Sequence, residues 1–114
     1  MAATPEGRVK DAAKKYFGEI GAYYYMPVSN GMGRVGAPDF IVCAPITITA
    51  DMVGKTVGLF CGFEAKAPGN IKGATANQLR EIAAIQAAGG EACVFDDVEQ
   101  LRAALNHYCL RAYV

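Results

Sequence analysis

The chain has 114 residues, of which 53% are hydrophobic and 19% are charged, and this balance excludes an intrinsically disordered protein. Its length predicts one compact domain over residues 1–114, and no segment approaches the ~20 consecutive apolar residues of a membrane helix. Eleven basic and eleven acidic residues cancel, which excludes a whole-molecule positive field for coating nucleic acid.

The first predicted element is a helix over residues 5–20, with Thr4 as its N-cap and Pro5 at its first position. Apolar residues recur along it at helical spacing and form one stripe: Val9, Ala12, Ala13, Tyr16, Phe17 and Ile20. Gly21 ends this helix. A tyrosine-rich strand over residues 22–28, a flexible connection over residues 29–36 and a strand over residues 40–48 follow.

The second half of the chain predicts a strand, a helix and a strand joined by a crossover. The strand covers residues 56–65, the helix residues 76–88 and the second strand residues 91–95. Thr75 and Gln78 have the spacing of a capping box, and Asp96 is the expected cap of a last helix to about residue 111. The crossover predicts a parallel strand pair, and the first three strands can form an antiparallel meander. The fold class is therefore α/β, with one mixed sheet flanked by helices.

The four cysteines do not have the spacing of a disulfide framework or a zinc site. None forms a C-x-x-C pair, and His107 is the only histidine. We expect buried, reduced thiols. The N-terminus lacks the basic and apolar segments of a signal peptide, so we expect an intracellular protein.

Residues 31–36 match G-x-G-x-x-G letter for letter. The motif binds a dinucleotide when its glycines open a helix, whereas here Pro38 and a β-branched run predict a strand. We interpret the segment as a glycine-rich lip beside Asp39, from which Arg34 is free to reach a phosphate. A plain hairpin loop explains it equally well.

Two carboxylates and a lysine lie at the ends of neighbouring predicted strands. Asp39 begins the apolar run 40–43, and Glu64 and Lys66 end the run 57–63. Because side chains alternate along a strand, Glu64 and Lys66 point the same way and Ala65 points into the core. Two hard oxygens beside an ammonium suit a divalent cation that faces an anionic substrate. A surface salt bridge at the strand ends is the plainer alternative.

These residues resemble a known signature. Pro38-Asp39 followed by Glu64-Ala65-Lys66 is similar to the PD-(D/E)xK nuclease motif. Gly36, the Ala67-Pro68 turn and Gln78 add similarity to its virus-type replication-repair nuclease (VRR-NUC) branch. The resemblance covers nearly the whole chain and implies a restriction-endonuclease-like core.

The resemblance also implies roles for individual residues. Asp39 and Glu64 would coordinate Mg²⁺ or Mn²⁺ with the main-chain carbonyl of Ala65. Glu6 is a further candidate ligand, although a carboxylate in a first helical turn also favours the helix dipole.

Lys66 would orient or help to deprotonate the attacking water, and Gln78 would hold the water or the substrate backbone. The capping box is the alternative role of Gln78, and one side chain cannot fully serve both. DNA contacts are expected from Arg34 and Lys72 on loops, and from Lys10 and Lys14 on the first helix, where a solvated helix face is the alternative.

Members of this branch resemble metal-dependent endonucleases that cut branched DNA, including four-way (Holliday) junctions, during DNA repair. They are expected to act as homodimers, for which the run Tyr23-Tyr24-Tyr25 could supply an apolar patch, although strand packing explains it equally well. Two other classes stay open: a non-cleaving nucleic-acid-binding relative, and a small α/β interaction module whose charges are incidental.

Overall fold

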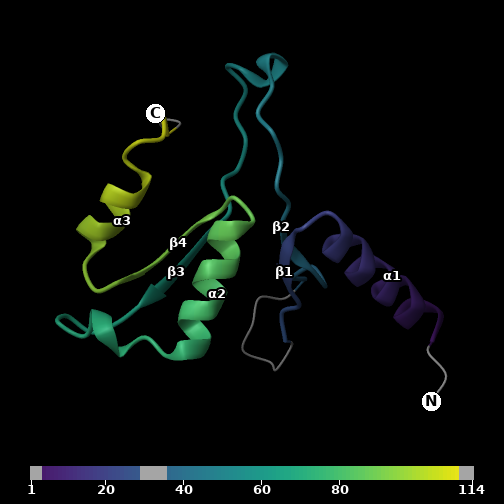
Figure 1. The fold of residues 1–114 in the computed structure, drawn as a ribbon, viewed down its shortest axis with the longest axis horizontal. Coiled ribbons are helices and arrows are strands. Elements are labelled where there is room, and N and C mark those ends of the chain that lie inside the picture. Colours follow the sequence, from purple (N-terminus) through teal and green to yellow (C-terminus); the bar gives the residue numbers. More distant parts are fainter. Residues whose placement is uncertain (1–3, 29–35, 111–114) are drawn as a thin grey trace. The chain divides into compact units, whose positions relative to one another are not determined.

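The computed structural model describes residues 4–28 and 36–110. Its helices and strands are α1 (Pro5–Glu19), β1 (Tyr23–Tyr25), β2 (Ile41–Cys43), β3 (Cys61–Ala65), α2 (Ala76–Ala87), β4 (Glu91–Phe95) and α3 (Val98–Leu105), as Figure 1 shows. The 3₁₀ turns η1 (Ala50–Met52) and η2 (Ile71–Gly73) lie on either side of β3. The chain divides into two compact units, the N-terminal unit (Met1–Ile46) and the C-terminal unit (Thr47–Val114). The mixed α/β class is therefore confirmed.

The strands of the described residues form two separate sheets. β1 pairs antiparallel with β2, and β3 pairs parallel with β4. The predicted parallel pair is confirmed, whereas the predicted meander of the first three strands is wrong. Pro45 has no N–H to donate to a ladder, which is consistent with pairing that ends at Cys43. β3 likewise begins only at Cys61, where its partner β4 begins at Glu91.

The ends of α1 follow the sequence closely. The N–H of Gly7 donates to Oγ1 of Thr4 over 2.9 Å, which confirms the predicted N-cap. Gly21 adopts a φ of 71°, a left-handed conformation that glycine reaches without strain, and the helix ends before it.

An aromatic cluster holds α1 against β1 and the start of β2. The ring of Phe17 lies 5.3 Å from those of Tyr24 and Phe40, and Tyr24 and Phe40 are 5.9 Å apart. Tyr24 is therefore packed inside this unit, while Tyr25 is 46% exposed. The three tyrosines consequently do not form one continuous exposed patch.

The predicted apolar stripe of α1 is only partly the packed face. Ala13 and Phe17 are half-buried, but Val9 and Tyr16 are 69% and 57% exposed. Lys10 takes the place of an apolar residue on the half-buried face. The stripe prediction is wrong at Val9, Ala12, Tyr16 and Ile20, which are all exposed. The half-buried face includes Lys10 instead, whose stem can cover apolar surface while its ammonium stays in water.

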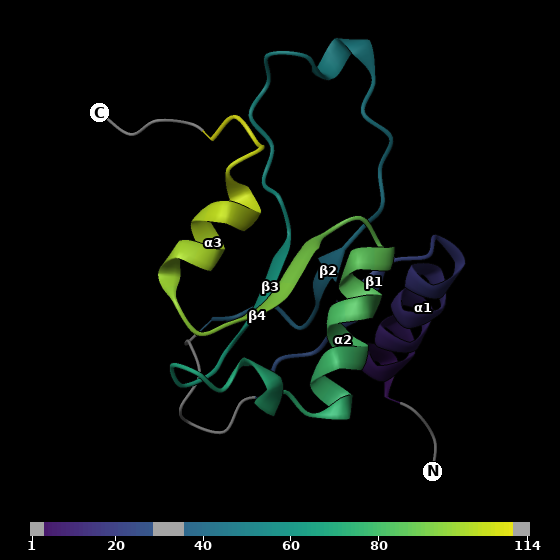
Figure 2. The same ribbon diagram turned by 60° about the vertical axis from the view of Figure 1, so that its left-hand side comes forward.

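In the C-terminal unit, α2 lies along one face of the β3–β4 sheet, as the two views in Figures 1 and 2 agree. Ile85 of α2, the C-cap residue Ala88 that follows the helix and Ala92 of β4 are among the buried residues, with 5–6% exposure each. Nε2 of Gln86 donates to the carbonyl oxygen of Ala92 over 2.9 Å and ties the helix to the strand. This small contact layer is the packed centre of the unit.

The predicted capping box of α2 is confirmed. The N–H of Gln78 donates to Oγ1 of Thr75 over 3.1 Å, and the N–H of Thr75 donates to Oε1 of Gln78 over 2.9 Å. The cap of α3 differs from the prediction, because Asp97 and not Asp96 accepts from the first turn, through the N–H of Glu99. α3 also ends at Leu105, well before residue 111.

The other face of the β3–β4 sheet carries aromatic side chains. The rings of Phe63 and Phe95 meet edge to face with centroids 6.3 Å apart. Ala65 ends β3 on this same face and is exposed, so the prediction that it points into the core is wrong. Alternation assigns a residue to one face of a strand. It does not show whether that face is still buried at the end of the strand, which extends past the packed centre.

The structure has all four cysteines as free thiols. Cys43 is buried, Cys61 and Cys93 are half-buried, and Cys109 is exposed, so the expectation of burial is wrong for Cys109. Over the described part of the chain, no helix combines the length and the apolar character that crossing a bilayer requires.

Candidate functional site

Glu64 and Lys66 lie on the α2-covered side of β3. A Cβ placed on Gly62 would lie 2.5 Å from Cδ1 of Ile85, so position 62 faces α2. Because side chains alternate along a strand, positions 64 and 66 face the same side. The N–H of Lys66 donates to the carbonyl oxygen of Phe95 over 2.8 Å, which extends the ladder one residue beyond β3 and fixes the backbone there.

Gln78 belongs to the same end of this side. It lies seven residues before Ile85, close to two helical turns, so both face the sheet. Because α2 connects two parallel strands, it runs back against them. The chain rises about 13 Å from Gly62 to Lys66, and α2 rises about 10 Å from Ile85 back to Gln78. The backbone path therefore brings positions 64, 66 and 78 toward one end of the C-terminal unit.

The capping box determines which atoms of the Gln78 side chain remain available to bind a substrate or a water. Its Oε1 accepts the N–H of Thr75, so the Nε2 group is the part of the amide that can donate to a substrate or a water. Capping and a substrate contact would thus use different atoms of one side chain.

Asp39 lies in the N-terminal unit, just before β2. Its side chain is 63% exposed, and its Oδ2 lies 3.9 Å from Nζ of Lys10. An exposed pair at this distance contributes little to stability, about 0–1 kcal/mol before screening by salt reduces it. The carboxylate is consequently accessible to a further cation.

Glu6 lies one helical turn before Lys10, so the two side chains share a side of α1. The structure therefore places the candidate ligand Glu6 on the side of α1 that carries the lysine paired with Asp39. Glu6 is exposed and lies in the first turn of the helix, where its favourable interaction with the helix dipole also holds.

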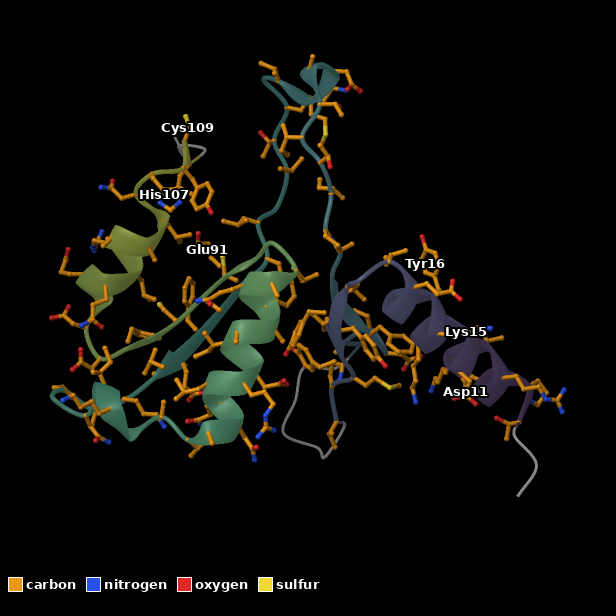
Figure 3. All side chains as sticks on the ribbon, in the orientation of Figure 1. Asp11, Lys15, Tyr16, Glu91, His107 and Cys109 are labelled. Carbon is orange, nitrogen blue, oxygen red and sulfur yellow. The ribbon has the colours of Figure 1, made fainter. Side chains whose placement is uncertain are left out.

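The candidate DNA contacts have different surroundings. Lys10 pairs with Asp39, and Nζ of Lys14 lies 4.0 Å from Oδ1 of Asp11, one turn earlier on α1. Figure 3 labels Asp11 on this helix. Lys72 is exposed and lies in η2, the 3₁₀ turn that precedes α2. Arg34 lies outside the described residues.

Sequence reasoning missed a group that holds the loop after Lys66. Oδ2 of Asp96 accepts the N–H of Gly69 over 2.8 Å, across 27 residues of sequence. The sequence did contain a signal: Asp96 and Asp97 are adjacent, and a helix needs only one of them as its N-cap. Asp96 was the residue expected to cap α3, and that function belongs to Asp97.

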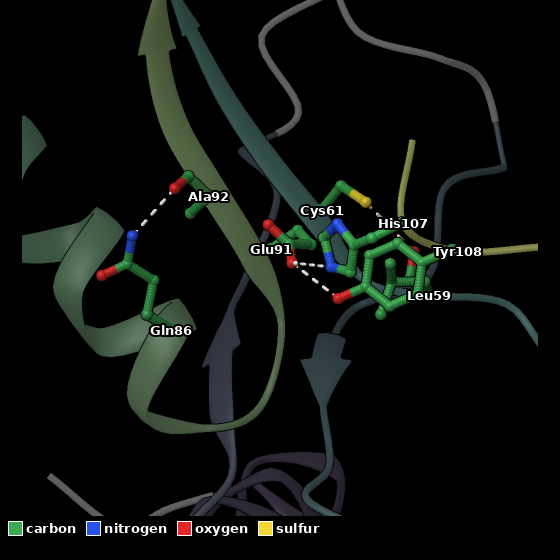
Figure 4. A network of polar contacts seen from close by, with 7 residues as sticks. All are labelled: Leu59, Cys61, Gln86, Glu91, Ala92, His107 and Tyr108. Carbon is green, nitrogen blue, oxygen red and sulfur yellow. Dashed lines mark hydrogen bonds and ion pairs between the residues drawn. The ribbon is translucent and has the colours of Figure 1, made fainter. Parts of the chain in front are cut away.

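A second polar cluster fastens the segment after α3 to the start of β4 (Figure 4). The hydroxyl of Tyr108 donates to Oε1 of Glu91 over 2.6 Å, and Nε2 of His107 lies 3.7 Å from the same oxygen. This hydrogen bond, with smaller contributions from burial and nearby charge, raises the pKa of Tyr108. Figure 3 also shows Glu91 and His107 on these two segments.

The thiols beside this cluster are not activated. Burial, followed by the charge of Glu91, raises the pKa of both Cys61 and Cys93. The Sγ–H of Cys61 donates to the carbonyl oxygen of Leu59 over 3.4 Å. Since a thiolate is the nucleophilic form, these raised pKa values disfavour Cys61 and Cys93 as nucleophiles.

In residues 4–28 and 36–110, no three His, Cys, Asp or Glu side chains form a metal-binding group. No protein-family model, no curated protein and no solved structure matches this chain. The likeness to the VRR-NUC nucleases is therefore carried by the residues quoted above.

Proposed function

We propose that this chain is a divalent-metal-dependent DNA endonuclease that hydrolyses phosphodiester bonds in branched DNA such as four-way junctions. The supporting observation is that Glu64 and Lys66 share the face of β3 beside the end of α2 that bears Gln78. A carboxylate, an ammonium and an amide donor at a strand end are groups that metal-assisted phosphodiester hydrolysis uses. The proposal includes a restriction-endonuclease-like core around them.

The donor set fits a hard cation. The carboxylates of Asp39 and Glu64 and the main-chain carbonyl of Ala65 would hold Mg²⁺ or Mn²⁺, with Glu6 as an additional ligand. Cys61 and Cys93 occupy the opposite face of the sheet from Glu64, so no soft sulfur joins this set. A bound ion would supply polarisation of the scissile phosphate and a lowered pKa of its coordinated water.

The remaining roles in the mechanism would belong to side chains of the protein. Lys66 holds positive charge where the phosphate gains negative charge in the transition state, and its ammonium orients the attacking water. The Nε2 group of Gln78 donates to a non-bridging phosphate oxygen or to that water, because its Oε1 is occupied by the cap. Lys72, which is exposed in the segment between Lys66 and Gln78, contacts the DNA backbone.

Cleavage of both strands at a junction would require two sites, which a homodimer would supply. Exposed apolar side chains such as Tyr25 and Val9 are available for a contact between copies. In this proposal each copy cuts one strand.

A panel of labelled duplex, flap, fork and four-way junction substrates tests the proposal. We expect cleavage of branched substrates with Mg²⁺ or Mn²⁺, none after chelation, and a mass in solution of two chains. Cleavage that survives chelation would contradict a metal-dependent mechanism.

The second candidate is a non-cleaving relative that binds nucleic acid. It is supported by the exposed lysines, and it predicts junction binding without products and without a calorimetric signal for Mg²⁺ alone. An interaction module predicts instead that neither metal nor DNA raises the melting temperature.

A further inference from the structure

The loop that follows Lys66 is tied to the far end of β4 by one carboxylate. Oδ2 of Asp96 accepts the N–H of Gly69 over 2.8 Å. Gly69 has a φ of 84°, a left-handed conformation in which a residue with a Cβ is strained. The turn is therefore specified from both sides, by the glycine within it and by the acceptor outside it.

The Asp96 carboxylate is itself held in place. Nε2 of Gln100 donates to Oδ1 of Asp96 over 2.8 Å, and the N–H of Asp96 donates to Oε1 of Gln100 over 2.8 Å. The amide of Gln100 thus closes a two-bond ring around Asp96. The orientation of the ring leaves Oδ2 directed at the loop.

The backbone between Lys66 and η2 follows a defined path. The N–H of Asn70 donates to the carbonyl oxygen of Ala67 over 2.9 Å, and the N–H of Gly73 donates to that of Asn70 over 2.9 Å. A Cβ on Gly73 would lie 2.5 Å from Nδ2 of Asn70, so the Asn70 side chain packs directly on position 73. The Asp96 contact joins this compact turn to β4, on which the N–H of Lys66 is also held.

We propose that Asp96 is a positioning residue for Lys66. It does not touch the substrate, and it acts through the Gly69 turn, three residues after the lysine, by fixing how the chain leaves β3. The inference rests on the proposed function, because it assigns a consequence for cleavage to a contact that holds the proposed catalytic lysine. Small displacements of a reacting group are costly, up to about 100-fold for a shift of about 1 Å.

The Asp96→Asn variant tests this role, because it replaces one acceptor oxygen by a donor NH₂ of the same size. Whichever way the new amide turns, its NH₂ faces either the N–H of Gly69 or the NH₂ of Gln100. The double variant Asp96→Asn with Gln100→Glu reverses the ring: the new amide donates to the new carboxylate and its oxygen again accepts from Gly69. Asp97→Asn is the matched control, since asparagine caps a helix as well as aspartate does.

Two measurements are made on all four proteins: amide hydrogen exchange at Gly69, and kcat and KM for the cleaved junction substrate. We expect Asp96→Asn to accelerate exchange at Gly69 about tenfold and to lower kcat about 10- to 100-fold with KM unchanged. The double variant should restore both, and the control should change neither.

Different results overturn different parts. Unchanged exchange at Gly69 in Asp96→Asn would show that the contact does not hold the turn. Faster exchange with unchanged kcat would refute the positioning role while leaving the nuclease proposal intact. A wild-type protein that cleaves no substrate would refute the proposed function itself, and the role of Asp96 with it.

Discussion

Gly62 of β3 lies directly against Ile85 of α2: a Cβ at position 62 would approach Cδ1 of Ile85 to 2.5 Å. This contact fixes which face of β3 the helix covers. Strand alternation then assigns Glu64 and Lys66 to the same face. One glycine therefore links the packing of the C-terminal unit to the direction of its candidate catalytic side chains.

The variant Gly62→Ala should destabilise the protein by about 1–3 kcal/mol, because the added methyl overpacks the contact with buried Ile85. Ile85→Val removes Cδ1 and alone should cost about 0.5–1.5 kcal/mol. Urea unfolding of the single and double variants measures both effects. The double variant should lose less than the sum of the two, and additive losses would contradict the contact.

Replacement of either candidate metal-binding carboxylate should abolish cleavage without unfolding the protein. Asp39→Ala removes an exposed side chain, and Glu64→Gln keeps the shape of a half-buried one, so circular dichroism should remain that of the wild type. Asp11→Asn and Glu99→Gln, which remove carboxylates of exposed ion pairs, are the matched controls and should cleave normally. Normal cleavage by Asp39→Ala or Glu64→Gln would remove that residue from the site.

Lys66→Met should lower kcat about 10²- to 10³-fold, the usual cost of losing one group that stabilises transition-state charge. Substrate affinity should change much less, because the phosphate backbone is also contacted elsewhere. Lys72→Met is the matched control and should weaken binding more than it lowers kcat. A Lys66→Met variant with wild-type kcat would exclude Lys66 from the chemistry.

Local signals in the sequence predicted the starts of α1 and α2 well. The Thr4 cap and the Thr75–Gln78 capping box are both present, since each is decided by atoms three residues apart. Strand extents were predicted less well, because β-branched runs such as residues 46–49 have strand propensity but no partner strand in the described sheets. Propensity alone does not supply the second half of a hydrogen-bonded ladder.

The candidate site was likewise predictable where it depends on local spacing and unpredictable where it depends on contacts between distant residues. The common face of Glu64 and Lys66 follows from alternation, but the role of Asp96 does not, because its partner Gly69 lies 27 residues away. The pairing of Lys10 with Asp39 was equally invisible, since it joins a helix to the segment before β2. Such contacts depend on the chain path and not on local spacing.

Stability at alkaline pH should depend on Tyr108. Its hydrogen bond to Glu91 favours the neutral phenol in the folded protein, so the folded pKa lies above the ordinary 10.0. The stabilisation is thus complete below pH 10.0 and is lost as the pH rises through the folded pKa. Denaturant unfolding across this range should show a steeper loss for the wild type than for Tyr108→Phe. Equal slopes would contradict the contact with Glu91.

The most direct measurement is anomalous diffraction from a crystal of the protein soaked in Mn²⁺. The proposal predicts one ion within coordination distance, about 2–2.3 Å, of a carboxylate oxygen of Asp39 and one of Glu64. Carboxylate groups too far apart to contact the same ion, or manganese bound only elsewhere, would contradict the shared metal site on which the nuclease proposal depends.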